Sequence, residues 1–284
     1  MRVKVCGGSQ SEVLVIQINK LSPTIGAEVI GLDLTNLSQD NWRLIDEAFA
    51  EHQMLVFRGQ DLEPEKQLAF ARRFGELHLH PAAPSLEQFP EIMLIHADEN
   101  SKHVAGNAWH TDVSCEEEPP SITMLYMMEL PPIGGDTLFA SMYAAYETLS
   151  DELKERIAPL RALHSSDHIY TGRYNVGAND SRAGTYPKAY HPMVTTHPVT
   201  GRKALFVNQA FTTAIEGMDD DEAQPLLNRL FSHQQKPEFQ CRLKWDVGSL
   251  AMWDDRCTQH YAIWDYFPQR RHGHRVTVAG TVPS

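Results

Sequence analysis

The sequence predicts a mainly β fold with flanking helices, an antiparallel sandwich of the jelly-roll type. In the second half of the chain, short apolar runs alternate with turn residues, which is the pattern of short strands joined by tight connections. Many short strands with few helices indicate an antiparallel sandwich, of which the jelly roll is the favoured version. The strands predicted here are Ile122–Met128, Met193–Thr196, Ala204–Val207, Phe239–Trp245, Leu250–Trp253 and Val276–Ala279.

The first half of the chain is predicted to mix strands with helices. Three apolar runs have the length of buried strands, namely Val13–Ile18, Ala27–Leu32 and Met54–Phe57. Between the last two, Asn41–His52 carries apolar residues at helical spacing. A second helix is expected to begin at Pro64, because proline is favoured in the first turn of a helix.

Two helices, a hairpin and a long loop are predicted among the later strands. The helices cover Met142–Arg156 and Asp219–His233, and the second opens with acidic residues that complement the helix dipole. The segment HPVTGRKALFV predicts a hairpin with its turn at Thr200-Gly201. Residues 165–188 are rich in Gly, Ser, Asn and Tyr. A loop of this length inside a compact domain is usually a functional lid or is disordered.

Composition and charge bound the class of protein. The chain has 284 residues, of which 42% are hydrophobic and 22% charged, and no repeat or linker divides it. We therefore expect one domain over residues 1–284. A formal net charge of −12 argues against a nucleic-acid partner, because phosphate binding relies on clustered Lys and Arg. There is no apolar stretch of membrane length, no secretory signal and no CxxC pair, so we expect a cytoplasmic protein without a membrane partner.

The strongest chemical signal is the sequence Trp109-His110-Thr111-Asp112. On a strand or at its end, this HxD spacing places an imidazole and a carboxylate on one face, because successive residues alternate sides. Two histidines and one carboxylate form the facial triad that non-haem iron(II) oxygenases use, with positions left open for substrates. An HxD pair alone arises often by chance, so the interpretation requires a third ligand.

His260 is the best candidate for that third ligand. It follows the predicted strand Leu250–Trp253 and precedes three arginines, Arg270, Arg271 and Arg275. An oxygenase that uses 2-oxoglutarate needs a fixed cation for the remote carboxylate of this cosubstrate, and the planar arginine fork grips a carboxylate at two points. The alternative is a basic surface turn, QRRHGHR, beside a hydrogen-bonded core histidine.

Longer segments extend this signal over nearly the whole chain. They are GAEVIGLDL, ARRFGELHLHP, WHTDVS, LPPIGGDTLFASM, THPVTGRKALFVN and WDDRCTQHYAIWDYFPQRRHGHR. Through them the chain resembles the TauD/TfdA group of dioxygenases, which act on taurine and 2,4-dichlorophenoxyacetate. The resemblance implies a double-stranded β-helix of the clavaminate synthase-like type. It also implies an Fe(II)- and 2-oxoglutarate-dependent dioxygenase that uses O2 to hydroxylate a small organic anion, giving succinate and CO2, with ascorbate supporting activity.

The resemblance implies roles for five residues around the metal. His110, Asp112 and His260 are expected to bind iron. Arg271 and Thr137 are expected to bind the C5 carboxylate of 2-oxoglutarate, whose other end chelates the metal. The residues alone would make Thr137 an ordinary strand residue after a Gly-Gly-Asp turn.

Four further residues are expected around the substrate. The resemblance implies that Arg275 and His80 contact its anionic head group, and that Val113 and Phe211 line its pocket. The residues alone leave plainer interpretations open. His80 would be a hydrogen-bonded loop histidine, Val113 a buried strand valine and Phe211 a core aromatic.

Four positions depart from the pattern of the taurine enzyme. Gly106 stands where that enzyme has Asn, Ala83 where it has Tyr and Cys115 where it has Phe. These changes predict a wider pocket without the recognition of taurine's amine. Asp255 replaces the Asn of the usual WDNR element. A sulfonate or sulfate ester is the expected substrate, with an aryloxyalkanoate or a natural-product carboxylate as alternatives.

Two other classes of protein stay open at this point. A non-catalytic, metal-dependent binding module would keep the fold and the metal. A zinc hydrolase would accept the same three ligands but has no use for an arginine that binds a cosubstrate carboxylate. Relatives often self-associate, so a dimer or tetramer is expected.

Overall fold

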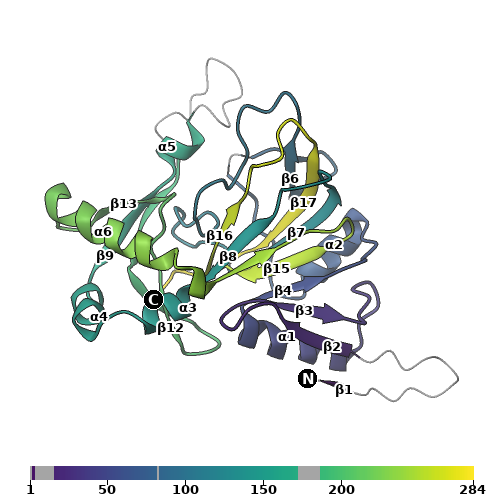
Figure 1. Cartoon of the computed structure of the whole chain (residues 1–284), viewed down its shortest axis with the longest axis horizontal. Coiled ribbons are helices and arrows are strands. Elements are labelled where there is room, and N and C mark those ends of the chain that lie inside the picture. Colours follow the sequence, from purple (N-terminus) through teal and green to yellow (C-terminus); the bar gives the residue numbers. More distant parts are fainter. Residues whose placement is uncertain (1, 4–15, 82, 172–185) are drawn as a thin grey trace, which may run out of the picture.

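Two sheets form the body of the protein in the computed structural model, which describes residues 2–3, 16–81, 83–171 and 186–284 (Figure 1). Within these residues the major sheet has nine strands, in the order β1 (Arg2–Val3), β2 (Ile16–Lys20), β3 (Ala27–Ile30), β4 (Met54–Phe57), β15 (Leu250–Asp254), β7 (Ile122–Glu129), β17 (Arg271–Val278), β6 (Phe89–Ala97) and β5 (Ser85–Leu86). Its neighbouring strands are antiparallel except for β3 and β4. The minor sheet is β14 (Gln240–Leu243), β8 (Thr137–Ser141) and β16 (Thr258–Ala262), all antiparallel.

Smaller elements surround these sheets. A third sheet consists of β10 (Lys188–Pro192), β9 (Arg161–Ser165) and β13 (Thr212–Ile215), and β11 (Val194–Thr196) pairs with β12 (Lys203–Leu205). The helices are α1 (Gln39–His52), α2 (Pro64–Ala71), α3 (Met142–Glu147), α4 (Asp151–Ile157), α5 (Asp167–Tyr170), α6 (Asp220–Gln234) and a short 3-10 helix at Pro237–Phe239. In the described part of the chain, none of the helices has the length and apolar character needed to cross a membrane.

The major and minor sheets share one apolar core. Strands β4 and β15 are buried at every position, because both faces of the major sheet are covered. Val56 and Trp253 belong to the same buried cluster as Phe139 and Leu243 of the minor sheet. Their neighbours along each strand point to the opposite face, since side chains alternate. This arrangement leaves a space between the sheets in which polar groups can be held away from water.

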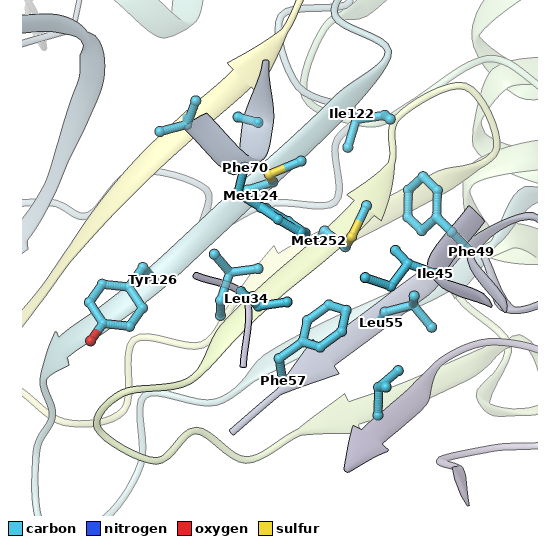
Figure 2. Close-up of a cluster of buried hydrophobic side chains, with 14 of the residues drawn as sticks. Leu34, Ile45, Phe49, Leu55, Phe57, Phe70, Ile122, Met124, Tyr126 and Met252 are labelled. Atoms are coloured by element: carbon cyan, nitrogen blue, oxygen red, sulfur yellow. The ribbon is translucent and has the colours of Figure 1, made fainter. Parts of the chain in front are cut away.

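Helices α1 and α2 cover the outer face of the major sheet. Figure 2 shows side chains of both helices against those of the strands, and the labelled members of this cluster are Leu34, Ile45, Phe49, Leu55, Phe57, Phe70, Ile122, Met124, Tyr126 and Met252. Ser38 caps α1 by accepting a hydrogen bond from the Asn41 amide, and the Asn41 side chain accepts one from the Ser38 amide. The apolar faces of the two helices thus form a second buried cluster with the outer face of the major sheet.

Strands β4, β7 and β15 and helices α1 and α6 lie where the sequence predicts them, within two residues at either end, and α2 begins at the predicted Pro64. The predicted hairpin is also present, with Gly201 in the left-handed region at φ 69°. The helix predicted over Met142–Arg156 is two helices, because Ser150 begins a new one by accepting a hydrogen bond from the Leu153 amide. Residues 13–15 of the first predicted strand lie outside the described residues.

Candidate active site

Three side chains from two distant segments converge between the sheets. His110 and His260 are joined by a pair of backbone hydrogen bonds, in which the amide of each donates to the carbonyl of the other at 3.1 and 2.9 Å. The carboxylate of Asp112 lies between their rings, with His110 Nε2 3.6 Å from Oδ1 and His260 Nε2 3.8 Å from Oδ2. The potential ligand atoms of the three residues all lie within 4.8 Å of one another, and all three side chains are buried.

Asp112 lies in a turn, which corrects the expectation that strand alternation places His110 and Asp112 on one face. Only His110 makes a strand-like bridge, and the chain turns over residues 112–115. Val113 has a φ of 46°, a left-handed conformation that is unfavourable for a β-branched residue. The turn therefore sets the position of the carboxylate. Val113 is buried, but it is not the strand valine that the residues alone indicate.

The three residues fit a divalent metal ion. His110 Nδ1 donates to the Ala108 carbonyl at 2.8 Å, so Nε2 is deprotonated in the neutral ring and faces the carboxylate as a lone-pair donor. Among the described residues, Asp112 Oδ2 has no hydrogen-bond partner although it is buried. Two imidazoles and one carboxylate are a donor set suited to non-haem Fe(II).

Strand β17 presents two arginines to this site. Val276 and Val278 belong to the apolar cluster between the major sheet and helices α1 and α2. The alternate positions Arg271, Gly273 and Arg275 therefore face the space between the sheets. The side chains of both arginines are almost fully buried. Buried guanidinium groups require anionic partners, because desolvation of an unpaired charge is costly.

Arg271 closes a small cavity on one side of the three ligands. This cavity, about 40 Å³, is also lined by Thr137, His110 and His260. The Arg271 Nε donates to the Gly135 carbonyl at 3.2 Å, whereas Nη2 has no partner among the described residues. Trp245 donates its indole N–H to Thr137 Oγ1 at 3.0 Å, which leaves the threonine proton available for an acceptor in the cavity.

Arg275 also lines this cavity and contacts Asp112 directly. Its Nη1 donates to Asp112 Oδ1 at 2.6 Å, and its Nε and Nη2 have no partner among the described residues. Burial alone would raise the pKa of Asp112. The charge of Arg275, with smaller contributions from His260 and His110, instead holds that pKa well below its ordinary value. The carboxylate therefore stays ionised at neutral pH.

A larger cavity of about 500 Å³ opens beside Arg275. Of the residues predicted to contact substrate, His80, Val113, Phe211 and Arg275 all line it, as does Gly106. The His80 Nδ1 accepts a hydrogen bond from the Ala83 amide at 2.9 Å, so its proton lies on Nε2. Burial, then the charge of Arg275, lowers the pKa of His80 to about 3, and the ring is neutral.

All nine site residues predicted from the sequence thus line one of these two cavities. The lining residues that were not predicted include Tyr170, Met93 and Tyr261. Tyr170 ends α5 within the loop that the sequence indicates as a lid, and its ring centroid lies 5.6 Å from that of His80. Its position in that predicted lid was the sequence feature that could have indicated a place in the cavity wall. Residues 172–185 of the same predicted lid lie outside the described residues.

Comparison with known proteins identifies the family. The family described as "Taurine catabolism dioxygenase TauD, TfdA family" matches residues 17–277. An alkylsulfatase of Acinetobacter baylyi is 35% identical over 96% of this chain and 88% of its own length. An alpha-ketoglutarate-dependent 2,4-dichlorophenoxyacetate dioxygenase of Cupriavidus pinatubonensis is 34% identical over 85% of this chain and 90% of its own. The crystal structure of a taurine dioxygenase from Burkholderia xenovorans superimposes with a TM-score of 0.80 at 34% identity, covering 94% of this chain and 92% of that one.

These matches define the class of the protein as a dioxygenase with the jelly-roll fold that the sequence predicts. The chain belongs to the TauD/TfdA family.

Proposed function

We propose that the protein is an Fe(II)- and 2-oxoglutarate-dependent dioxygenase that hydroxylates a small organic anion, a sulfonate or a sulfate ester. His110, Asp112 and His260 hold the metal in this proposal. The bound iron supplies the coupling of 2-oxoglutarate decarboxylation by dioxygen to substrate hydroxylation. The products are succinate, CO2 and the hydroxylated substrate.

One observation carries the proposal. Two buried arginines, four residues apart on the same face of β17, lie beside a carboxylate and two imidazoles, and only Arg275 of the two also lines the larger cavity. A zinc hydrolase or a simple binding module has no need of two such cations at one metal site. Two separate anions, a cosubstrate and a substrate, account for both arginines.

The smaller cavity suits the cosubstrate. Arg271 Nη2 and the Thr137 hydroxyl are the donors available there, and both suit the C5 carboxylate of 2-oxoglutarate. The Trp245 indole fixes the Thr137 oxygen, so the threonine is oriented before the ligand enters. The relative from Cupriavidus, whose name records alpha-ketoglutarate dependence, supports this assignment.

The larger cavity suits an anion with an apolar body. Arg275 and His80 contact its head group in this proposal, and His80 Nε2 also lies 3.5 Å from the Tyr170 hydroxyl. Val113 and Phe211 offer apolar surface to its tail. Gly106 lines the wall without a side chain, and the only ionised carboxylate lining the cavity within the described residues is that of Asp112. An alkyl sulfate or sulfonate fits this surface better than taurine, whose ammonium group would require an acidic partner. An aryloxyalkanoate is the second candidate, because its carboxylate requires the same donors and its ring the same apolar surface.

The experiment is a substrate screen with matched readouts. Purified protein is incubated with Fe(II), ascorbate and 2-oxoglutarate, and with alkyl sulfates, alkanesulfonates, taurine or 2,4-dichlorophenoxyacetate. We expect succinate to form in proportion to released sulfate, sulfite or phenol for at least one anion, with alkyl compounds ahead of taurine. No substrate-dependent succinate across the panel would contradict the proposal.

The remaining parts of this proposal concern the setting of the enzyme. We infer one catalytic domain over residues 1–284 that acts in the cytoplasm as a dimer or tetramer. Light scattering after size-exclusion chromatography tests the self-association, and a monomeric mass would reject it.

A further inference from the structure

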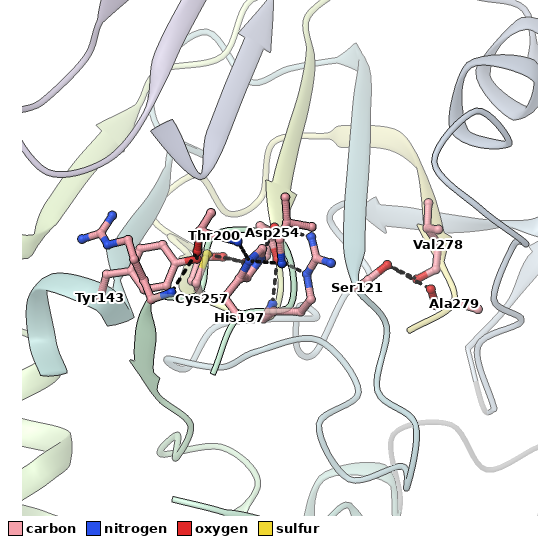
Figure 3. A network of polar contacts seen from close by, with 12 residues as sticks. Ser121, Tyr143, His197, Thr200, Asp254, Cys257, Val278 and Ala279 are labelled. Carbon is pink, nitrogen blue, oxygen red and sulfur yellow. Dashed lines mark hydrogen bonds and ion pairs between the residues drawn. The ribbon is translucent and has the colours of Figure 1, made fainter. Parts of the chain in front are cut away.

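A second buried polar cluster lies at the end of β15, beside the turn that leads into β16. Figure 3 shows Asp254 at its centre, with His197 and Cys257 close by. Each oxygen of the Asp254 carboxylate accepts from Arg256, at 2.8 Å from Nε and 2.6 Å from Nη2. Oδ2 also accepts from His197 Nε2 at 3.0 Å. Asp254 is almost fully buried, so these bonds replace the water that the carboxylate has lost.

His197 has a defined protonation state in this cluster. Its Nδ1 accepts hydrogen bonds from the amides of Val199 and Thr200, at 3.2 and 3.1 Å. The ring proton therefore lies on Nε2, where it is donated to Asp254. A neutral histidine thus ties the turn between β11 and β12 to the end of β15.

The cluster is not suited to a metal ion, although His197, Asp254 and Cys257 lie close enough together to hold one. The Arg256 guanidinium occupies both oxygens of Asp254 and already neutralises its charge. Burial raises the pKa of the Cys257 thiol well above its ordinary value, so no thiolate is present as a ligand at neutral pH. The cluster instead anchors the chain at Asp254.

Two hydrogen bonds lead from this anchor to the candidate metal ligands. The Asp254 carbonyl accepts from Thr258 Oγ1 at 2.8 Å. The Thr258 carbonyl in turn accepts from Thr111 Oγ1 at 3.0 Å. Thr111 stands between His110 and Asp112, and Thr258 stands two residues before His260. Both threonines are buried, so water does not compete for either bond.

We propose that Thr111 and Thr258 are positioning residues for the metal site. Their hydroxyls connect the anchored turn at Asp254 to the segment that carries His110 and Asp112, and so fix the spacing of the three ligands. This inference rests on the proposed function, because it requires that the three residues bind a metal. Residues that orient metal ligands typically contribute about ten- to a hundredfold in metal affinity.

The test measures metal binding without turnover. Metal-free protein is titrated with Mn(II), and free Mn(II) is followed by electron paramagnetic resonance. Thr111→Val keeps the shape of the side chain and removes the hydroxyl, and we expect it to weaken Mn(II) binding about ten- to a hundredfold. Thr111→Ser restores the hydroxyl and should bind nearly as well as the unaltered protein. Thr258→Val tests the next bond in the chain and should weaken binding in the same direction.

Ser121→Ala provides the matched control. Ser121 donates its hydroxyl to the Ala279 carbonyl at 2.9 Å, a partly buried bond from a side-chain hydroxyl to a backbone carbonyl that does not involve the ligands (Figure 3). This variant should lose stability in urea without losing Mn(II) affinity. Equal Mn(II) affinity of Thr111→Val and the unaltered protein would overturn the inference alone. A loss of Mn(II) affinity in Thr111→Ser as large as that in Thr111→Val would also overturn the inference. Failure of the unaltered protein to bind Mn(II) would overturn the proposed function as well.

Discussion

At the scale of single residues, the protonation states of the site suit a cation before any metal arrives. Burial, with the nearby His110, lowers the pKa of His260 well below its ordinary value. The pKa of Asp112 is held low by Arg275. At neutral pH the site therefore presents the Asp112 carboxylate and a neutral His260 ring, and neither group has to lose a proton when a metal binds.

The ligand assignment predicts the behaviour of three variants. His110→Ala, Asp112→Ala and His260→Ala should each abolish substrate-dependent formation of succinate, because two remaining ligands hold Fe(II) weakly. His103→Ala, a change at an exposed histidine in the preceding loop, should leave activity unchanged. Succinate assays at saturating 2-oxoglutarate measure this, and full turnover by any of the three ligand variants would reject the assignment.

Arg271 is expected to act on the cosubstrate alone. Arg271→Ala removes charge-assisted hydrogen bonds worth about 1.5–3 kcal/mol, which corresponds to a rise of about 10- to 100-fold in the KM for 2-oxoglutarate. Its neighbour Arg270 is exposed, with its Nε 3.7 Å from Glu129 Oε1, so Arg270→Ala is the control. An unchanged KM in Arg271→Ala would remove this residue from the cosubstrate site.

Substitution of the buried Asp255 by asparagine is expected to stabilise the protein. Burial, then the charge of Asp112, raises the pKa of Asp255 well above its ordinary value. The unfolded chain thus releases this proton at lower pH than the folded one, and stability falls as pH rises above about 3.9, the value for a free aspartate. Asp255→Asn keeps an oxygen for the Thr123 hydroxyl, which donates to Asp255 Oδ2 at 2.7 Å. Metal-free Asp255→Asn should resist urea better than the parent at pH 7, with a smaller advantage at pH 5. Lower stability at pH 7 would contradict the argument.

At the scale of elements, β17 combines structural and chemical roles. Its outward residues fill the core under α1 and α2, while Arg271 and Arg275 face the site. Gly273 lies between the two arginines, where a Cβ atom would come within 2.6 Å of the Tyr126 carbonyl oxygen on β7. The absence of a side chain therefore lets β17 and β7 pair closely where the site is built.

Because of this close approach, Gly273→Ala tests whether the position of β17 determines the positions of both arginines. We expect a loss of about 1–3 kcal/mol from overpacking, together with weaker binding of 2-oxoglutarate, because both arginines shift with the strand. Gly217→Ala is the control: it has open space around it but a φ of 71°, so it costs stability through backbone strain alone. Urea titrations and cosubstrate KM values separate the two, and a normal KM in a destabilised Gly273→Ala would show that the arginines do not depend on this contact.

The sequence predicts best the elements whose burial follows a simple pattern. Strands β4 and β15 are continuous apolar runs because both of their faces are covered. Strands β8 and β16 were indicated only at Thr137 and His260 and without bounds, since both strands turn these polar residues inward to form the site. Strand β6 was missed as well, because Pro90 and Glu91 interrupt its apolar run.

At the scale of the whole molecule, the site is an opening between two sheets, with two cavities that share His110 and Arg275 in their linings. The HxD segment and the strand carrying His260 are far apart in the chain, and the sequence indicates both because each carries its own chemical pattern. The turn at Val113 and the contact between Tyr170 and His80 could not be predicted. They depend on left-handed backbone geometry and on a packing contact between distant segments, neither of which has a local sequence period.

His110, Asp112 and His260 are proposed to hold one Fe(II) beside a site for 2-oxoglutarate. Anaerobic absorption spectroscopy tests this proposal most directly, because Fe(II) chelated by 2-oxoglutarate gives a charge-transfer band that either component alone lacks. We predict that this band appears when both are added to the unaltered protein, shifts when a substrate anion binds, and is absent in His260→Ala. A band of equal intensity in His260→Ala, or none in the unaltered protein, would contradict the account.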